Sequence, residues 1–200
     1  MKWQDKGYSY ECYTSALYDI KDLGFTRNFL KDLPHFFNTH GTTIHKARNE
    51  IKFYELNGHK LNIKKYCITP IINRILYSLN IRTAKCKRAF FNAERILQAG
   101  FRTPKPFVYI IQRKYGLIYY SYFISEHIQN ASQLGHNCKD KDLIKSFAVF
   151  TANLNKKGLA SKDYIPGNIL YSKTNESYTF TLVDVNRFDF FSKPLNIHQA

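Results

Sequence analysis

The sequence predicts an α+β protein with two lobes, in which a strand-rich first part precedes a helix, a loop and a hairpin. Three observations predict it. Residues 43–66 contain two extended segments around Asn57-Gly58, a strong hairpin signal. Residues 84–99 have the periodicity of an amphipathic helix, and a second helical pattern covers residues 141–157. Strands followed by a helix, a loop and a hairpin indicate two lobes joined near residues 125–130.

The first part is expected to begin with a hairpin and continue into a helix. Thr43–Leu56 is predicted to be one long extended segment, and His59–Tyr66 is predicted to be the returning strand. Apolar and polar residues alternate from Leu61 to Lys64, as in a strand with one buried face. A helix over residues 84–99 follows, and Gly100 is expected to end it at the C′ position.

A second strand pair, a hinge and a second helix follow. Phe107–Gln112 and Leu117–Ile124 are predicted to pair around Tyr115-Gly116, and the polar segment Ser125–Asn137 is a candidate hinge. The helix over Lys141–Lys157 is predicted from apolar residues that step by four, three and four: Leu143, Phe147, Phe150 and Leu154. After it come the loop and short strand ASKDYIPGNILY, the turn SKTNES and the strand YTFTLVDV.

Composition describes a globular protein with a strong positive charge. The chain has 200 residues, 44% of them hydrophobic, and a net charge of +15. This charge favours an anionic partner, which is a nucleic acid, a phospholipid head group or a phosphorylated glycolipid. No signal peptide and no apolar run of transmembrane length is visible, so a membrane partner is expected to be met at its surface. The cysteines form no C-x-x-C pair and are expected to be reduced, as in a cytosolic protein: Cys12, Cys67, Cys86 and Cys138.

Four polar residues stand in the order that phosphoryl transfer from ATP requires. Lys64 ends a strand, Asp163 and Asn168 lie five positions apart in a loop, and Asp184 ends a later strand. A lysine on a rigid strand holds the α- and β-phosphates of ATP. An Asn and an Asp supply the hard oxygen ligands that Mg²⁺ prefers, and an Asp beside the acceptor hydroxyl accepts its proton. Each residue alone is a weak signal, but the ordered set on the expected elements favours a kinase.

The segments KKGLASKDYIPGNILY and LVDVNR resemble the catalytic and metal-binding segments of the lipopolysaccharide kinase family. These are the Kdo and heptose kinases of Gram-negative bacteria, a branch of the protein-kinase-like fold, and the bacteroidete-type members are nearest. Three upstream segments resemble the same family in the same order, so that the resemblance covers roughly residues 29–200: LPHFFNTHGTTIHKARNEIKFYELNGHKLNIKKY, INRILYSLNIRTAKCKRAFFNAERILQAGFRTPKP and YYSYFISEHI.

The resemblance implies a protein-kinase-like two-lobe fold, with a strand-rich N-lobe and a helical C-lobe that looks truncated. It implies four parts: an N-terminal extension (1–28), a nucleotide-binding N-lobe (29–124), a hinge (125–137) and an incomplete catalytic C-lobe (138–200).

The resemblance also implies roles for the residues of the ordered set. Asp163 is expected to be the catalytic base, and Asn168 and Asp184 are expected to bind magnesium. Lys64 is expected to contact the phosphates of ATP, because Leu61-Asn62-Ile63-Lys64 stands where kinases have Val-Ala-Ile-Lys. Three departures from the usual pattern accompany these residues: Ser161 replaces a His, Asn186 replaces a Gly, and Asn62 replaces a small apolar residue.

Further residues are implied to bind the nucleotide. Glu126 and His127 are expected to lie in the hinge, whose backbone holds adenine. Lys46 and Arg48 belong to a segment that replaces a glycine-rich phosphate loop. Glu94 is the only acid of the helix and the candidate partner of Lys64, although alignment on the glycine turn places an alanine there and Glu94 also fits an ordinary surface position.

The expected function is ATP- and Mg²⁺-dependent transfer of phosphate to a hydroxyl of the lipopolysaccharide inner core, on Kdo or heptose of lipid A. The partners are then ATP, an anionic glycolipid of the Kdo-lipid A type, and the inner face of the inner membrane, to which a cytoplasmic enzyme binds peripherally. A basic patch is a candidate for that contact, although a solvated helix face explains it equally well: Arg82, Lys85, Lys87 and Arg88.

Three alternatives remain open. The departures from the kinase pattern and the early end of the chain also fit a pseudokinase that binds nucleotide without transferring phosphate. A kinase of the same fold with another acceptor shares the same core residues. A nucleic-acid-binding protein fits the charge, but no RRM, KH or helix-turn-helix signature is present and the basic residues are scattered, so no nucleic-acid partner is predicted.

Overall fold

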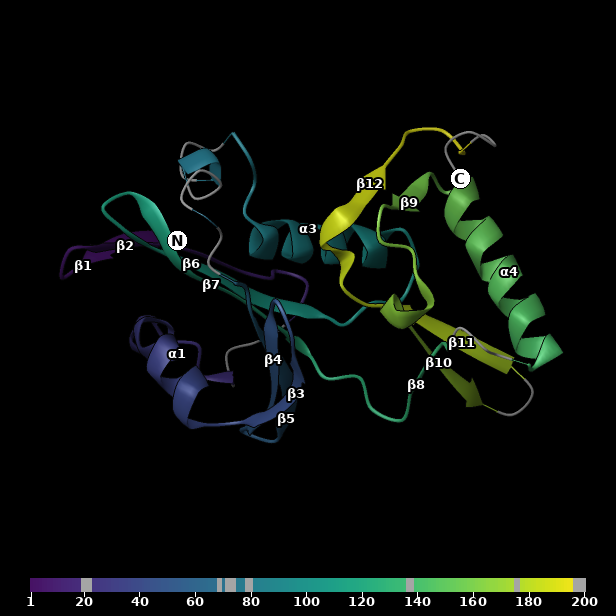
Figure 1. Ribbon diagram of the computed structural model, residues 1–200, viewed down its shortest axis with the longest axis horizontal. Helices are drawn as coiled ribbons and strands as arrows, with labels where there is room; N and C mark the ends of the chain where they lie inside the picture. Colours follow the sequence, from purple (N-terminus) through teal and green to yellow (C-terminus); the bar gives the residue numbers. More distant parts are fainter. Residues whose placement is uncertain are drawn as a thin grey trace. The chain divides into compact units, whose positions relative to one another are not determined.

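The computed structural model describes most of the chain: residues 1–18, 23–67, 70, 75–77, 81–135, 139–174 and 177–195 (Figure 1). It divides into two compact units. Unit 1 contains residues 1–91 and 105–127, and unit 2 contains residues 92–104 and 128–200. The domain boundaries expected from the sequence stay a prediction.

Unit 1 is built on a seven-stranded antiparallel sheet with the order β1-β2-β6-β7-β5-β4-β3. Its strands are β1 (Lys2–Asp5), β2 (Tyr8–Thr14), β3 (Thr42–Lys46), β4 (Glu50–Leu56), β5 (His59–Lys65), β6 (Pro106–Lys114) and β7 (Leu117–Glu126). Central strand β6 is buried from Pro106 to Gln112, which explains why its sequence is a nearly continuous apolar run.

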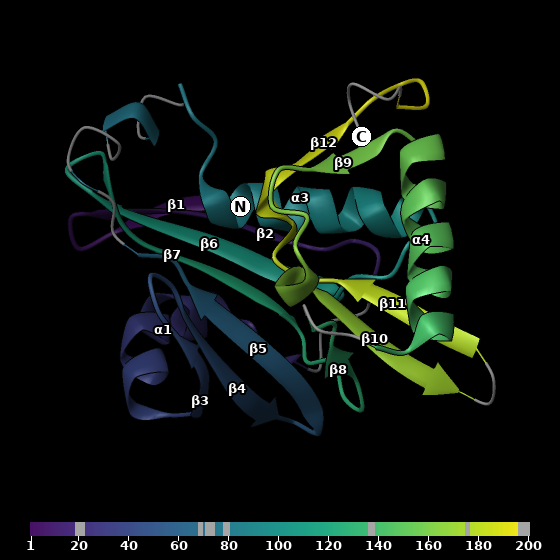
Figure 2. The same ribbon diagram turned by 45° about the vertical axis from the view of Figure 1, so that its right-hand side comes forward.

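A helix packs on each face of this sheet (Figure 2). Helix α1 (Arg27–Thr39) buries Leu30, Leu33 and Phe37 against one face. The first half of α3 (Lys85–Gln98) packs on the other face. The sheet residues alternate between the two cores: Val108, Ile110, Tyr122 and Ile124 pack with α1, whereas Tyr109, Ile111 and Phe123 pack with α3.

Unit 2 combines the second half of α3 with helix α4 (Lys141–Lys156) and two small sheets. One sheet has the order β11-β10-β8, and the other pairs β12 with β9. The remaining elements are β8 (Ser132–Gln133), β9 (Leu159–Ser161), the 3-10 helix η2 (Pro166–Asn168), β10 (Ile169–Thr174), β11 (Ser177–Leu182), the 3-10 helix η3 (Val185–Arg187) and β12 (Phe188–Phe190). Their apolar side chains form one core: Ala93, Ile96, Leu143, Leu154, Leu159, Ile169, Phe180, Leu182 and Val185, among others.

Glycines end both predicted helices as the sequence indicates. Gly100 has φ 89°, its N–H donates to Leu97 O (3.0 Å), and the N–H of Phe101 donates to Ile96 O (3.1 Å). These two bonds form a Schellman motif, which satisfies carbonyls that the helix end would leave unpaired. Gly158 follows α4 with φ 70°. The predicted hairpins at Asn57-Gly58 and Tyr115-Gly116 are confirmed as well.

Three sequence expectations about elements were wrong or incomplete. The single extended segment 43–56 is two strands, because the chain turns at residues 47–49, where Ala47 N–H donates to Asn49 O (3.1 Å). The strand expected to end at Asp184 ends at Leu182. Strands β1 and β2 were not predicted because residues 2–14 are largely polar. Helix α1 was not predicted because Pro34 lies inside it.

The sequence predicts no transmembrane segment and reduced cysteines, and the structure bears on both points. Among the helices of the described ranges, none has the length and apolarity needed to cross a bilayer. Among the described residues, Cys12 and Cys86 are buried free thiols and Cys67 is an exposed cysteine outside any disulfide, while Cys138 lies outside the described ranges.

Candidate active site

The loop between β9 and β10 holds Asp163 and Asn168 in a fixed arrangement within unit 2. The N–H of Asp163 donates to Ser161 Oγ (3.2 Å), so Ser161, which stands where kinases usually have His, orients this loop. Asn168 Nδ2 donates to the Asp163 carbonyl (3.0 Å), and the Asn168 carbonyl accepts from Val183 N–H (2.9 Å). The loop is therefore tied to the end of β11, directly before Asp184.

Asp184 adopts the left-handed conformation, with φ 53° and ψ 50°. Asp tolerates this region better than most residues, and such backbone conformations concentrate at functional sites. Asn186 is buried, and its Nδ2 donates to Asp184 Oδ1 (2.5 Å). Asn186 therefore has a structural reason to replace the glycine of the usual kinase motif, since its amide orients the carboxylate of Asp184.

Arg187 contacts the proposed catalytic carboxylate directly. Its Nη1 lies 2.7 Å from Asp163 Oδ1, with both side chains partly exposed. The pairing of β9 with β12 sets this contact, because Phe188 lies opposite Ser161 and Lys162 N–H donates to Arg187 O (3.1 Å). The sequence shows Arg187 only as the last letter of D-x-N-R, and a role for it was missed.

Helix α3 also holds this segment in place. Asn92 Nδ2 donates to the carbonyls of Val185 (2.9 Å) and Phe188 (3.4 Å). Unit 2 thus brings together Asp163, Asn168 and Asp184, as the ordered motif predicts. Glu94 lies partly exposed on α3 in the same unit, whereas Lys64 belongs to unit 1, so the pairing of Glu94 with Lys64 stays a prediction.

In unit 1, Lys64 lies in the middle of the sheet, on the face that α3 covers. It stands opposite Ile51 of β4 on one side and Phe123 of β7 on the other. Its neighbour Ile63 points into the α1 core, so Lys64 points the other way, and its Nζ lies 5.3 Å from the centre of the Tyr66 ring. A strand paired on both sides gives this lysine the rigid base that phosphate binding requires.

The predicted hinge residues end β7 in unit 1. The N–H of Glu126 donates to Lys105 O (2.9 Å) and the N–H of His127 donates to Lys60 O (2.9 Å). Asn62 Oδ1 lies 3.0 Å from His127 Nδ1, which explains a polar residue at a position where kinases have a small apolar one. Burial, assisted by the charge of Lys60, lowers the pKa of His127, so the ring is neutral near pH 7.

Lys46 ends β3 and Arg48 lies in the turn between β3 and β4, and both are exposed. Lys46 stands opposite Glu50, and Glu50 stands opposite Lys65, so this turn lies at the Lys64 end of β5. Glu126 of β7 stands opposite Leu61 of β5. Leu61 precedes Lys64 by three residues, which separates the two by about 10 Å along the strand. In unit 1 the residues predicted to bind phosphate therefore lie near one end of β5, and those predicted to hold adenine lie beside its other end.

A sequence model of the lipopolysaccharide kinase (Kdo/WaaP) family matches residues 37–190. The chain belongs to this family. It is therefore a phosphotransferase with a protein-kinase-like fold, and the fold and enzyme class predicted from the sequence are confirmed.

Solved structures show the same fold at low sequence identity. WaaP, solved in complex with acyl carrier protein, superposes with a TM-score of 0.61 at 11% identity, covering 92% of this chain and 75% of that chain. The Rio2 kinase of Chaetomium thermophilum, solved as an ADP/Mg²⁺-phosphoaspartate complex, gives a TM-score of 0.54 at 11% identity, covering 82% and 53%. Among curated proteins, none matches the chain in sequence.

Proposed function

We propose that this enzyme transfers the γ-phosphate of ATP to a hydroxyl of the lipopolysaccharide inner core, on Kdo or heptose attached to lipid A. The observation that carries the proposal is the interlocked arrangement of Asp163, Asn168 and Asp184 in unit 2. The family match supports a lipopolysaccharide acceptor in general, and the sugar and the use of ATP are our inference.

Asp163 is the proposed base. Its carboxylate would orient the acceptor hydroxyl and accept the proton as the oxygen attacks phosphorus, while the phosphate–ADP bond breaks. The Arg187 guanidinium holds one carboxylate oxygen, Oδ1. The second oxygen is then the one that we assign to the acceptor.

The oxygen atoms of Asn168 and Asp184 fit Mg²⁺, which would neutralise charge on the transferred phosphoryl group when bound. The Nδ2 of Asn168 donates to Asp163, so the amide oxygen is the atom that we assign to the metal. Among the described residues, no group of three or more His, Cys, Asp or Glu side chains is arranged so that it could hold a metal ion. Two protein ligands completed by phosphate oxygens and water are typical of kinase magnesium sites.

Unit 1 supplies the proposed nucleotide contacts. Lys64 would bind the α- and β-phosphates, with Lys46 and Arg48 adding charge from the β3–β4 turn. At Glu126 and His127 the N–H groups already donate within the sheet. Adenine recognition at these two residues would therefore rest on their carbonyl oxygens. Glu94 remains the proposed partner of Lys64.

The acceptor determines where the enzyme works. Kdo-lipid A is an anionic glycolipid of a membrane surface, and a chain with a net charge of +15 is attracted to such a surface. We therefore propose a cytoplasmic enzyme that binds peripherally to the inner face of the inner membrane.

The test is phosphate transfer with a matched pair of variants. The wild type, Asp163→Ala and Asp189→Asn would be incubated with γ-labelled ATP, Mg²⁺ and Kdo-lipid A. Asp189 is a suitable control because it is a partly exposed carboxylate of β12 paired with Lys162 (3.2 Å). We expect labelled lipid from the wild type and from Asp189→Asn, and a loss of about 10²–10⁴-fold in Asp163→Ala.

Two results would contradict the proposal. Equal transfer by wild type and Asp163→Ala would show that Asp163 is not the base. If the wild-type enzyme binds ATP but phosphorylates neither Kdo-lipid A nor its heptose-extended form, the proposed acceptor is wrong. If it binds ATP and transfers phosphate to no acceptor, a nucleotide-binding pseudokinase is favoured.

A further inference from the structure

Three hairpins of unit 1 share the same kind of turn but not the same turn residues. Each is a two-residue turn in which both residues have positive φ: 46° and 79° at Lys6-Gly7, 51° and 78° at Asn57-Gly58, and 52° and 76° at Tyr115-Gly116. Positive φ at both positions is typical of type I′ turns, which strongly favour Asn-Gly. Only the middle turn of these three has the favoured pair. Tyr and Lys at the first position go against the local conformational preference.

The two unusual turns lie side by side at one end of the sheet. Tyr8, which follows the first turn, stands opposite Lys114, which precedes the second. Strand β7 runs from this end to Glu126, and β5 pairs with it so that Asn57-Gly58 lies at the opposite, hinge end. The pair of turns is therefore separate from the residues assigned to adenine (Figure 2).

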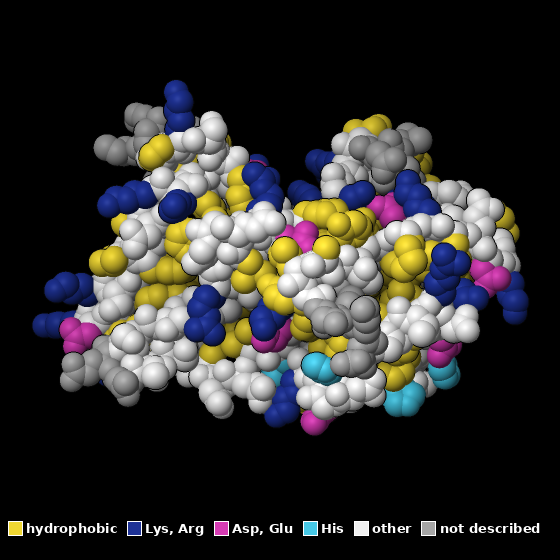
Figure 3. Space-filling view, turned by 180° about the vertical axis from the view of Figure 1, so that it is seen from behind, with side chains coloured by type: hydrophobic (Ala, Val, Ile, Leu, Met, Phe, Trp, Pro, Cys, Tyr) yellow, Lys and Arg dark blue, Asp and Glu magenta, His cyan; other side chains and the backbone are white. Residues whose placement is uncertain are grey.

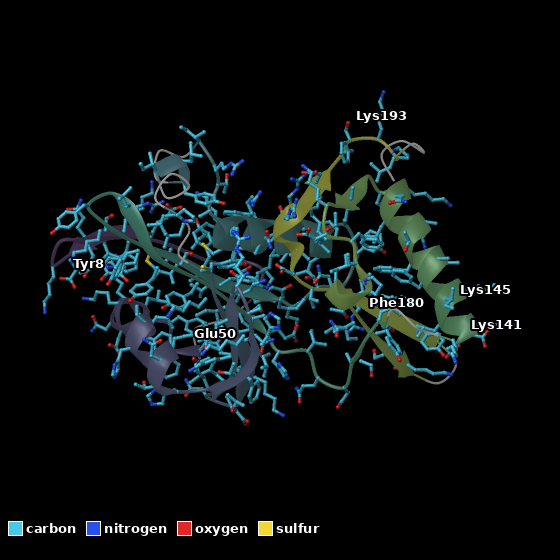
Figure 4. All side chains as sticks on the ribbon, viewed as in Figure 1. Tyr8, Glu50, Lys141, Lys145, Phe180 and Lys193 are labelled. Carbon is cyan, nitrogen blue, oxygen red and sulfur yellow. The ribbon has the colours of Figure 1, made fainter. Side chains whose placement is uncertain are left out.

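The side chains around the two turns are aromatic and basic. Tyr115 is 89% exposed, far more than a tyrosine held for packing would be. Lys114 Nζ lies 5.4 Å from the ring centre of Tyr8 and 5.6 Å from that of Tyr115, and Tyr8 lies 5.8 Å from Tyr119. Tyr8, the first residue of β2, is labelled in Figure 4.

The acids closest to these turns already have basic partners. Asp5, next to the first turn, pairs with Lys31 of α1 (3.0 Å). Glu11, further along β2, contacts Lys87 (2.9 Å) and Arg113 (3.3 Å). The charge presented at the turns is therefore positive, from Lys6 and Lys114.

We propose that these turns form a surface that binds an anionic phospholipid bilayer, which we call the hairpin-tip surface: Lys6, Tyr8, Lys114, Tyr115 and Tyr119. Tyrosine side chains prefer the interface between head groups and hydrocarbon, and lysines are attracted to anionic head groups. A lipid surface explains why an exposed Tyr and a Lys occupy turn positions where Asn would fold better. The inference rests on the proposed function only in that a lipid-linked acceptor brings the enzyme to a membrane.

The turn preference suggests variants that remove a proposed lipid-binding side chain and give the turn its favoured residues. Lys6→Asn and Tyr115→Asn each create the Asn-Gly pair that Asn57-Gly58 already has. The matched control is Lys173→Asn, which removes a lysine that lies over a tyrosine ring on a different hairpin, 5.1 Å from Tyr178. Thermal unfolding should show the two turn variants to be at least as stable as the wild type.

Cosedimentation with vesicles then tests the surface without using kinase activity. We expect wild type and Lys173→Asn to bind phosphatidylglycerol–phosphatidylcholine vesicles and to bind pure phosphatidylcholine weakly. Loss of one lysine at the surface should weaken binding roughly fivefold, and the Lys6→Asn/Tyr115→Asn double variant should lose more than tenfold. Phosphorylation of a soluble, deacylated Kdo acceptor should be unchanged in the double variant.

The outcomes separate this inference from the proposed function. Vesicle binding that depends on Lys6 and Tyr115 would support the hairpin-tip surface even if no sugar were phosphorylated. Equal binding by the double variant and the wild type would overturn it, as would equal binding to neutral vesicles. Weakened RNA binding with unchanged vesicle binding would identify a nucleic-acid surface instead.

Discussion

At the scale of single residues, the loop around Asp163 is held by short local contacts. Ser161 accepts from its backbone N–H, Asn168 donates to its carbonyl, and Arg187 binds its carboxylate. Asn186 in turn donates to the carboxylate of Asp184. Preorganised groups of this kind avoid reorganisation during a reaction, so Ser161 and Asn186, which depart from the usual kinase pattern, fit the proposed site.

Arg187 is the proposed positioning residue whose loss should be easiest to measure. In Arg187→Ala the carboxylate of Asp163 loses a contact of 2.7 Å, and a misplaced base can lower the rate about 10²-fold. We expect kcat to fall by about that factor while KM for ATP stays nearly constant. Arg187→Lys should recover part of kcat, because it restores the charge but not the planar fork.

The control for this prediction is Arg102→Ala, which removes an exposed arginine from another part of unit 2. Steady-state kinetics would be measured for all three variants. A raised KM with unchanged kcat in Arg187→Ala would mean that Arg187 binds substrate and does not position Asp163.

At the scale of elements, Glu11 connects three parts of unit 1. From β2 it contacts Lys87 of α3 (2.9 Å), and Arg113 (3.3 Å) and Tyr109 Oη (3.1 Å) of β6. Burial by itself would raise the pKa of Glu11, but the hydrogen bonds and charges of Lys87 and Arg113 outweigh it and hold the pKa below the usual value. Glu11 thus fixes the start of α3 against the sheet.

The lowered pKa makes this contact sensitive to acid. A carboxylate whose pKa is lower in the folded state stabilises the protein above its unfolded pKa, and this stabilisation is lost as the pH falls through the folded value. We expect Glu11→Gln to lower the free energy of unfolding by about 1–3 kcal/mol at pH 7. The difference from wild type should shrink as the pH falls below about 4.5, the ordinary pKa of a glutamate.

Urea unfolding at several pH values between 3 and 7 would measure this difference, with Glu55→Gln, an exposed acid of β4, as the control. A constant difference across that range would show that the charge of Glu11 is not what stabilises unit 1.

The elements that the sequence predicted are those with strong local signals. Asn57-Gly58 specifies its turn through positive φ, and Gly100 specifies the end of α3, so both could be placed without any tertiary information. Helix α1 was missed because Pro34 reads as a helix breaker, although its apolar face is buried on the sheet. Tertiary packing, which no local pattern displays, decides in favour of the helix there.

The site was predictable to the same extent. Spacing and order suggested Asp163, Asn168 and Asp184, which unit 2 brings together. Arg187 and Asp163 are 24 positions apart, and their contact depends on the pairing of β9 with β12. No periodicity in the sequence indicates this pairing. Such a partner becomes visible only when strand pairing is known.

At the scale of the whole molecule, the chain has a net charge of +15, and its basic side chains are spread over the face drawn in Figure 3. Lys and Arg side chains are more numerous than Asp and Glu on the face in Figure 3, and they do not gather in one patch. A dispersed charge gives general attraction to anionic surfaces, whereas orientation has to come from a local feature. The hairpin-tip surface is our candidate for that feature.

The residues proposed to bind Mg²⁺-ATP are Lys64 in unit 1 and Asn168 and Asp184 in unit 2. A ligand that binds only the folded protein stabilises it by RT ln(1 + [L]/Kd), about 2.7 kcal/mol at one hundred times Kd. We therefore expect Mg²⁺-ATP to raise the melting temperature and to slow amide exchange both in β5 and in residues 163–168. Asp184→Asn should lose the part of this effect that depends on Mg²⁺. Protection restricted to one of these two segments would contradict the role proposed for the residues of the other.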